Sequence, residues 1–269
     1  MTTTPVIDIK QISKIYGGKN ANQVYALNNI TFTMQEGEFI GIMGASGSGK
    51  TTLLNVISTL DNPTNGTISI AGTDITRMKS RELSDFRAQR LGFIFQDFNL
   101  LDNLTVYENI ALPLSLQDVP ADFIRSKVSQ VMEKLNITVI AEQYPSMISG
   151  GQRQRTAAAR AIVHKPALLL GDEPTGSLDL KNAVSLLEMM KRLNEEDRIS
   201  ILMVTHDAFS ASYCKRILFI QDGQLVKELY RSSSREIFYK QILNVLGDYG
   251  STAAEGIAIE TNNSYGSER

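Results

Sequence analysis

The segment Gly44–Thr51, with the sequence GASGSGKT, constrains the fold of this chain more than any other. It follows apolar residues 39–43, which are typical of a buried strand, and precedes residues 52–57, which can begin a helix. Glycines let the backbone curl so that successive N–H groups point at phosphate oxygens, and the helix N-terminus adds the positive end of its dipole. The sequence therefore predicts a phosphate-binding loop, and the matching flanks argue against a flexible Gly/Ser linker.

An acidic pair, Asp172-Glu173, follows a second apolar run at residues 167–170. Such a run suits a strand that is buried on both faces, and ligands of parallel sheets bind where the strands end. Together with the loop, the pair predicts a site for a nucleoside triphosphate and magnesium. Lys50 can reach the β- and γ-phosphates, the Thr51 hydroxyl and Asp172 can hold the metal, and Glu173 can activate water. Alone, two acids that merely end a strand would be equally plausible.

Composition limits the partners and the compartment. The chain has 269 residues, enough for one sizeable core with a subdomain, and a net charge of -2, which argues against a broad nucleic-acid surface. Cys214 is the single cysteine, which is consistent with a reducing compartment. The N-terminus lacks the pattern of a signal peptide, and no apolar run approaches the ~18 residues of a membrane span. We expect a cytosolic protein unless a partner holds it at a membrane.

The pattern of apolar residues divides the chain into three parts. Residues 5–90 predict strands with turns and end in a helical stretch over 79–90. Residues 98–160 are helical in spacing, with a helix expected to begin near Pro120 and another after Ser149. Residues 166–230 alternate between strand and helix patterns, which predicts a parallel sheet covered on both sides.

The C-terminal part follows a polar break at residues 231–234. Ser233 and Glu236 have the spacing of a capping box, and an apolar stripe follows at Phe238, Ile242 and either Val245 or Leu246. We expect an amphipathic helix over 231–246 that packs on the core or on a partner. Residues 247–269 are rich in Gly, Ser, Asn and Glu and are expected to form a disordered tail.

Five segments, in chain order, resemble motifs of ATP-binding-cassette (ABC) ATPases. Residues 148–152, with the sequence ISGGQ, resemble the family's signature motif, although the family usually has leucine in place of the isoleucine. Tyr16, Gln96, Asp179 and His206 lie where the family has its adenine-stacking aromatic, Q-loop glutamine, D-loop aspartate and switch histidine. Each residue alone has a simpler structural explanation, and the ordered set favours the family. Tyr25 is an alternative to Tyr16 for the adenine contact.

The resemblance covers about residues 5–230 and implies an α/β fold, that of a P-loop NTPase of the ABC type. This fold has a RecA-like core, an antiparallel β subdomain and a helical signature subdomain. The expected domains are an ABC ATP-binding domain over 1–230, with the helical subdomain at about 98–160, then the C-terminal helix and the tail.

The resemblance also implies the site residues, with ATP and Mg²⁺ as the ligands. The residues expected to contact ATP are Tyr16, Gly44, Ala45, Ser46, Gly47, Ser48, Gly49, Lys50, Thr51 and Thr52. Those expected to act in hydrolysis are Glu173, His206 and Gln96, and those expected to hold Mg²⁺ are Thr51, Gln96 and Asp172. Those expected to contact ATP of the opposing subunit are Ser149, Gly150, Gly151, Gln152 and Asp179. The resemblance implies that the site is split between two subunits. With one cassette in this chain, this implies a homodimer that closes head to tail on ATP.

Among the functions of this family, the sequence favours an ABC transporter ATPase. A chromosome-organising or DNA-repair member would carry a long coiled coil between the phosphate loop and the signature, and no sustained heptads occur there. A transporter subunit implies an integral-membrane permease as partner, a location at the cytoplasmic face of the membrane, and no nucleic acid.

Four segments, residues 92–101, 43–48, 204–207 and 211–214, are similar to ATPases of bacitracin- and lantibiotic-resistance transporters. This resemblance implies a large permease and a link to a sensor histidine kinase through it. Lipoprotein release and macrolide-type efflux are the alternatives, because related branches use the same cassette.

Overall fold

The computed structural model describes residues 4–17 and 22–248. The expected disordered tail lies almost entirely outside these residues. No helix within the described ranges has both the length and the apolar character needed to cross a bilayer.

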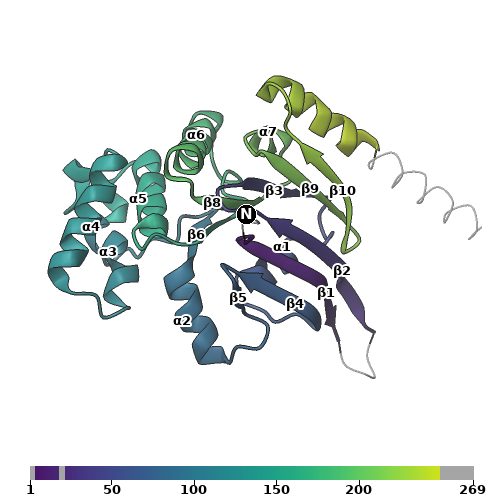
Figure 1. Ribbon diagram of the computed structural model, residues 1–269. Helices are drawn as coiled ribbons and strands as arrows, with labels where there is room; N and C mark the ends of the chain where they lie inside the picture. The colour runs from purple at the N-terminus through teal and green to yellow at the C-terminus, as the bar shows by residue number, and fades with distance from the viewer. Residues whose placement is uncertain (1–3, 18–21, 249–269) are drawn as a thin grey trace, which may run out of the picture.

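A six-stranded sheet forms the centre of the molecule (Figure 1). Its strand order is β10-β9-β3-β8-β7-β6, and all neighbours are parallel except the edge strand β10, which pairs antiparallel with β9. The strands are β3 (Phe39–Met43), β6 (Leu91–Phe95), β7 (Leu168–Asp172), β8 (Ser200–Val204), β9 (Arg216–Gln221) and β10 (Gln224–Tyr230). Every residue of β3 and β8 is buried, as expected of strands covered on both faces.

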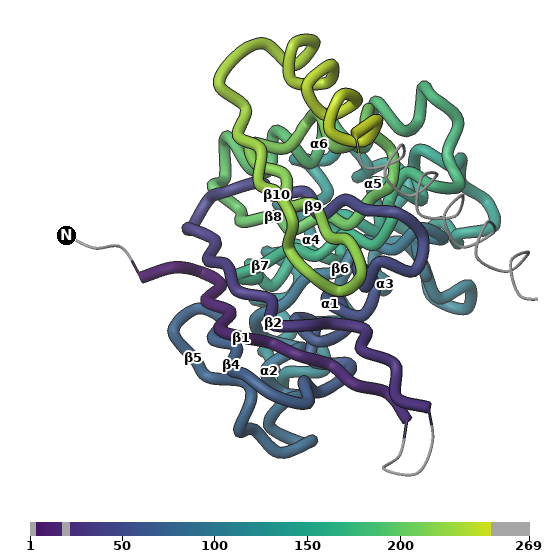
Figure 2. The backbone as a smooth tube through the Cα atoms, turned by 90° about the vertical axis from the view of Figure 1, so that its right-hand side faces the viewer, coloured from purple at the N-terminus to yellow at the C-terminus, as the bar shows by residue number. Residues whose placement is uncertain are grey.

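A second, antiparallel sheet covers one face of the first. It has the order β2-β1-β4-β5. Its strands are β1 (Ile7–Tyr16), β2 (Val24–Met34), β4 (Asn65–Ile70) and β5 (Thr73–Asp74). Helix α1 (Lys50–Ile57) lies between the two sheets (Figures 1 and 2), and its apolar side chains share one buried cluster with residues of both. This packing fixes the phosphate loop, because α1 begins where the loop ends.

Helices cover the other face and extend to one side. They are α3 (Val106–Ser115), α4 (Ala121–Lys134), α5 (Gly150–Ile162), α6 (Leu180–Asp197) and α7 (Ala208–Ala211), with short 3₁₀ turns η1 (Thr138–Ile140) and η2 (Pro145–Met147). Helix α2 (Ser80–Arg90) instead lies on the α1 side, where its Leu83 and Phe86 belong to the same buried cluster as α1. Figure 1 shows α3, α4 and α5 as a group to one side of the sheets. The period-2 alternation of β8 serves both faces: Ile201 and Met203 pack on the helical side, and Leu202 and Val204 pack toward α1.

A C-terminal helix occupies residues 235–248, where the sequence predicted 231–246. The predicted cap at Ser233 is wrong by one residue: Ser234 Oγ accepts from the Ile237 N–H, and the Ser234 carbonyl accepts from the Phe238 N–H. Phe238 and Ile242 are fully buried in the helical-side cluster (0% exposed). The helix lies over α7 and β9 (Figure 1).

Candidate functional site

The phosphate loop connects β3 to α1 and is locked by close backbone contacts. Gly49 has φ +105°, a left-handed conformation that L side chains rarely adopt. A Cβ on Gly44 would lie 2.1 Å from the Ile220 carbonyl oxygen, and one on Gly49 would lie 2.4 Å from the Ala26 carbonyl oxygen. Neither position has room for a side chain, so the two glycines hold the loop against β9 and β2.

Two polar side chains of the loop fit a phosphate ligand. Lys50 is 8% exposed, and its Nζ donates to the carbonyls of Gly44 at 3.0 Å and Ala45 at 2.7 Å. Burial lowers the pKa of Lys50, while the charges of Glu173 and Asp172 oppose this shift. Among the described residues, the buried Ser48 Oγ has no hydrogen-bond partner. A buried hydroxyl and a desolvated ammonium at a helix N-terminus are the groups that a phosphate would satisfy.

The acidic pair lies at the end of strand β7, between its neighbours β6 and β8. Asp172 ends β7, beside Phe95 of β6 and Val204 of β8. Burial raises the pKa of the Asp172 carboxyl, Glu173 raises it further, and Lys50 opposes the rise. A divalent cation there would favour the ionised form, so Asp172 suits a metal.

Glu173 and His206 are brought into direct contact. Glu173 lies just beyond β7 with φ +45°, and its N–H donates to the Val204 carbonyl at 3.0 Å. Its Oε1 lies 2.9 Å from His206 Nδ1, and its Oε2 accepts from the His206 N–H at 3.4 Å. The left-handed conformation of a non-glycine residue costs of order 1–3 kcal/mol in backbone strain, and it persists only where the surrounding structure holds it. The carboxylate and the imidazole therefore share one edge of a hollow of about 860 Å³ that the phosphate loop also lines.

Gln96 lies beside the acidic pair. With Thr51, Asp172 and Glu173 it lines a hollow of about 360 Å³, and its carbonyl accepts from Ser177 Oγ at 3.0 Å. Amide, hydroxyl and carboxylate oxygens are the ligands that Mg²⁺ prefers. Within residues 4–17 and 22–248 no three His, Cys, Asp or Glu side chains gather. The donor set thus fits a Mg²⁺ that is completed by phosphate oxygens rather than a protein cage.

Two tyrosines compete for the adenine position. The Tyr16 hydroxyl donates to Asp61 Oδ2 at 2.8 Å, with the Lys14 ammonium 4.8 Å from the ring centroid. Tyr25 lines a hollow of about 330 Å³ with Thr52 and other residues at the loop. Tyr16 and Tyr25 are both more than 40% exposed, so either ring has a free face.

Sequence reasoning missed Asp61 and Asp222. Asp61 holds Tyr16, and Asp222 lines the hollow beside Tyr25. The Asp222-Gly223 pair, a hairpin signal between β9 and β10, could have located the second residue.

The signature residues lie apart from this site within one chain. Ser149 caps α5: its Oγ accepts from the Gln152 N–H at 3.3 Å, and Gln152 Oε1 accepts from the Ser149 N–H at 2.8 Å. Asp179 caps α6 in the same way, accepting from the Asn182 N–H at 2.9 Å. The hollows around the phosphate loop are lined by none of Ser149, Gly150, Gly151, Gln152 and Asp179.

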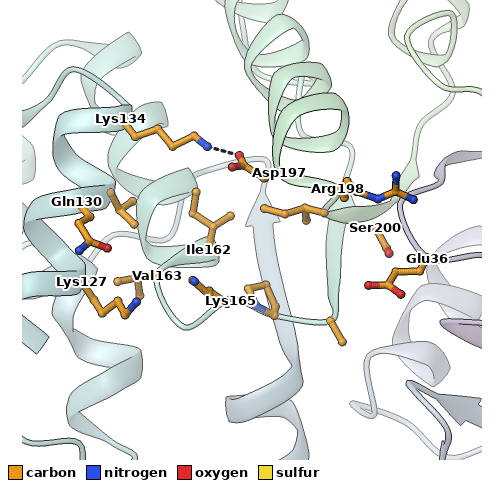
Figure 3. Close-up of a pocket in the computed structure, with 14 residues that line it drawn as sticks. Glu36, Lys127, Gln130, Lys134, Ile162, Val163, Lys165, Asp197, Arg198 and Ser200 are labelled. Atoms are coloured by element: carbon orange, nitrogen blue, oxygen red, sulfur yellow. Dashed lines mark hydrogen bonds and ion pairs between the residues drawn. The ribbon is translucent and has the colours of Figure 1, made fainter. Parts of the chain in front are cut away.

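Another hollow, of about 440 Å³, lies at the opposite edge of the sheet, where β7 and β8 begin (Figure 3). Lys127 and Lys134 of α4 line one side, and Glu36 and Ser200 line the other. Lys134 pairs with Asp197 across it. Because the phosphate loop and the acidic pair lie at the other ends of the strands, this hollow is not part of the candidate site.

A phosphate loop packed between two sheets, an acidic pair beside it and a capped signature helix define an ATPase of the ATP-binding-cassette class. The model of the ABC transporter family matches residues 27–176, more than half of the chain, and the chain belongs to this family. It is an ABC transporter ATP-binding protein, and it hydrolyses ATP as this family does.

The chain is similar to two bacterial proteins and to one solved structure. The ABC transporter ATP-binding protein YxdL of Bacillus subtilis is 49% identical over 248 residues, 92% of this chain and 96% of that protein. The bacitracin export ATP-binding protein BceA of Halalkalibacterium halodurans is 49% identical over 246 residues, 91% and 97% of the two chains. The dimeric, post-hydrolysis structure of the cassette MJ0796 bound to ADP and Pi is 36% identical, with a TM-score of 0.74 over 85% of this chain and 100% of that one.

Proposed function

We propose that this ATPase drives a membrane permease that protects the cell from a peptide antibiotic of the bacitracin or lantibiotic type. The observation that carries the proposal is the 49% identity to a bacitracin export ATPase over nearly the whole of both chains. The permease holds the ATPase at the cytoplasmic face of the membrane. A sensor histidine kinase that shares the permease is part of the same proposal.

The proposed hydrolysis uses residues that the fold brings to one edge of the sheet. Lys50 and the loop N–H groups would hold the β- and γ-phosphates, and Thr51, Asp172 and Gln96 would hold Mg²⁺, which would supply positive charge against the phosphates. Glu173 accepts a proton from the attacking water. His206, which contacts Glu173, orients this carboxylate toward the γ-phosphate.

The proposed site is completed by a second copy of the chain. Ser149 caps α5 and Gly151 lies in its first turn, where free N–H groups and the helix dipole favour an anion. An added Cβ on Gly150 would meet nothing within 4 Å, so this helix start is open to a partner. The dimeric state of the MJ0796 cassette supports a head-to-tail homodimer of this chain.

The loop after Gln96 is the proposed connection to the permease. The carbonyls of Phe98 and Asn99 accept from the Arg160 guanidinium at 2.7 and 2.6 Å, which ties this loop to α5, the signature helix. Leu101 is 44% exposed and offers an apolar contact. Closure of the dimer on ATP would move α5 and this loop together, and the loop would move the permease.

The experiment is gene deletion followed by growth inhibition with bacitracin, several lantibiotics and a macrolide. We expect increased susceptibility to at least one peptide, restored by the wild type and by Glu36→Gln, a carboxylate at the opposite edge of the sheet. Glu173→Gln should not restore growth. Unchanged susceptibility to every peptide refutes the resistance proposal, and a change confined to the macrolide favours small-drug efflux. Full rescue by Glu173→Gln would show that hydrolysis does not protect the cell.

A further inference from the structure

Helix α7 touches the chain beside both Glu173 and His206. Asp207, the residue after His206, caps α7 by accepting from the N–H groups of Phe209 and Ser210 at 3.1 and 2.8 Å. The Ser210 hydroxyl donates to Asp207 Oδ2 at 2.6 Å and lies 3.0 Å from Thr175 Oγ1. Thr175 follows Glu173 by two residues, and both hydroxyl residues are buried. A displacement of α7 would therefore disturb both Glu173 and His206.

The C-terminal helix holds α7 from the outside. The Arg235 guanidinium lies 4.5 Å from the ring centroid of Tyr213 and 5.2 Å from that of Phe209. These two rings meet edge to face with their centroids 5.8 Å apart, so the one cation contacts both rings of the pair. The Arg231 N–H donates to the Lys215 carbonyl at 2.9 Å, which anchors the start of this segment. The segment after His206 is thus enclosed between the sheet and the C-terminal helix (Figure 1).

The far end of the same helix reaches the nucleotide site. Leu246 lines the 860 Å³ hollow together with Val226, the phosphate loop and the Glu173–His206 pair. Phe238 and Ile242, fully buried between the two ends, fix the helix to the core. One rigid element therefore contacts α7 at its start and the wall of the hollow at its end.

We propose that the C-terminal helix is a positioning element for ATP hydrolysis. Arg235 holds α7 through Phe209 and Tyr213, and α7 holds the Glu173 and His206 segments in the geometry that hydrolysis needs. Arg235 is a positioning residue, because it contacts the rings of Phe209 and Tyr213 and does not line the hollow at the phosphate loop. A misplacement of about 1 Å at a reacting group can lower a rate about 10²-fold, so a partial loosening has a measurable effect. The inference rests on the ATPase activity alone and is independent of the transported substrate.

The first test separates turnover from binding in steady-state ATPase assays of the full chain. Arg235→Gln should lower kcat about three- to tenfold and leave KM for ATP within about twofold, because positioning is lost and the phosphate contacts stay. Arg235→Lys keeps a cation over the rings and should recover most of kcat. The matched control, Ile237→Ala, removes a half-exposed side chain from the outer face and should leave kcat unchanged. An unchanged kcat in Arg235→Gln, or an equal loss in Ile237→Ala, overturns the proposal.

A second measurement distinguishes local positioning from loss of stability. Amide hydrogen exchange should become faster at residues 207–211 in Arg235→Gln and stay unchanged at α1, which lies on the other face of the sheet. Ser210→Ala should act on the same path. If so, the fold decrease in kcat of the double variant Arg235→Gln/Ser210→Ala is smaller than the product of the fold decreases of the two single variants. Uniformly faster exchange, or effects on kcat that multiply, would contradict transmission through α7.

Discussion

Replacement of Glu173 by glutamine removes the proposed base and keeps its shape. The amide oxygen can still occupy the position 2.9 Å from His206 Nδ1, provided that the imidazole donates the hydrogen. The substitution also removes a negative charge that raises the pKa of Asp172 and opposes the lowered pKa of Lys50. Less negative charge beside the triphosphate should leave ATP affinity equal or higher. The expected effect is therefore confined to the chemical step.

The size of that effect follows from the role of the lost group. A positioned general base contributes about 10² to 10⁴ in rate, or roughly 3 to 5 kcal/mol in the activation free energy. We expect kcat of Glu173→Gln to fall within this range. Because the site is proposed to close around ATP in a homodimer, slow hydrolysis should also trap the ATP-bound dimer.

Two assays on the purified chain decide the result. Phosphate release measures kcat, and light scattering with ATP measures mass, which should double in Glu173→Gln. Glu36→Gln is the control, because it removes a carboxylate far from the phosphate loop. A kcat within tenfold of the wild type would refute Glu173 as the base. A strict monomer at saturating ATP would instead refute the shared site.

The remaining predictions concern four other parts of the molecule. Lys50→Ala should abolish hydrolysis, since it removes the ammonium buried in the loop, and near-normal turnover would exclude the phosphate-loop role. His206→Ala should lower kcat with little change in nucleotide affinity, measured by titration; an unchanged kcat would make the histidine structural. Ser149→Arg should block the ATP-bound dimer of the Glu173→Gln background in light scattering. A chain ended after residue 248 should keep its ATPase activity, because the later composition cannot form a core; inactivity in a folded product would contradict this.

Local parts of the fold could be predicted because their geometry depends on neighbouring residues. A helix after the phosphate loop and a helix after Ser149 follow from short motifs with defined backbone shapes, although α1 begins at Lys50 and not at the expected residue 52. The parallel sheet follows from alternating strand and helix patterns. The predicted C-terminal cap was wrong by one residue because the Ser233–Glu236 spacing indicated a capping box, whereas the adjacent Ser234 can also cap a helix. Only the packing of Phe238 and Ile242 on the core decides which serine ends the loop.

The contacts between distant segments could not be predicted in this way. Glu173 and His206 meet because β7 and β8 are neighbours in the sheet. Asp61, in the segment between α1 and β4, contacts Tyr16 because β4 pairs with β1. The position of α7 between the sheet and Arg235 likewise depends on where the C-terminal helix packs.

The sequence by itself determined which chemical groups this protein carries, because a glycine loop, an acidic pair and a signature motif are each read from a few neighbouring residues. The tertiary structure alone decided which of these groups touch. Strand order and helix docking are set by the burial of apolar surface over the whole chain, and that sum has no local signature in the sequence.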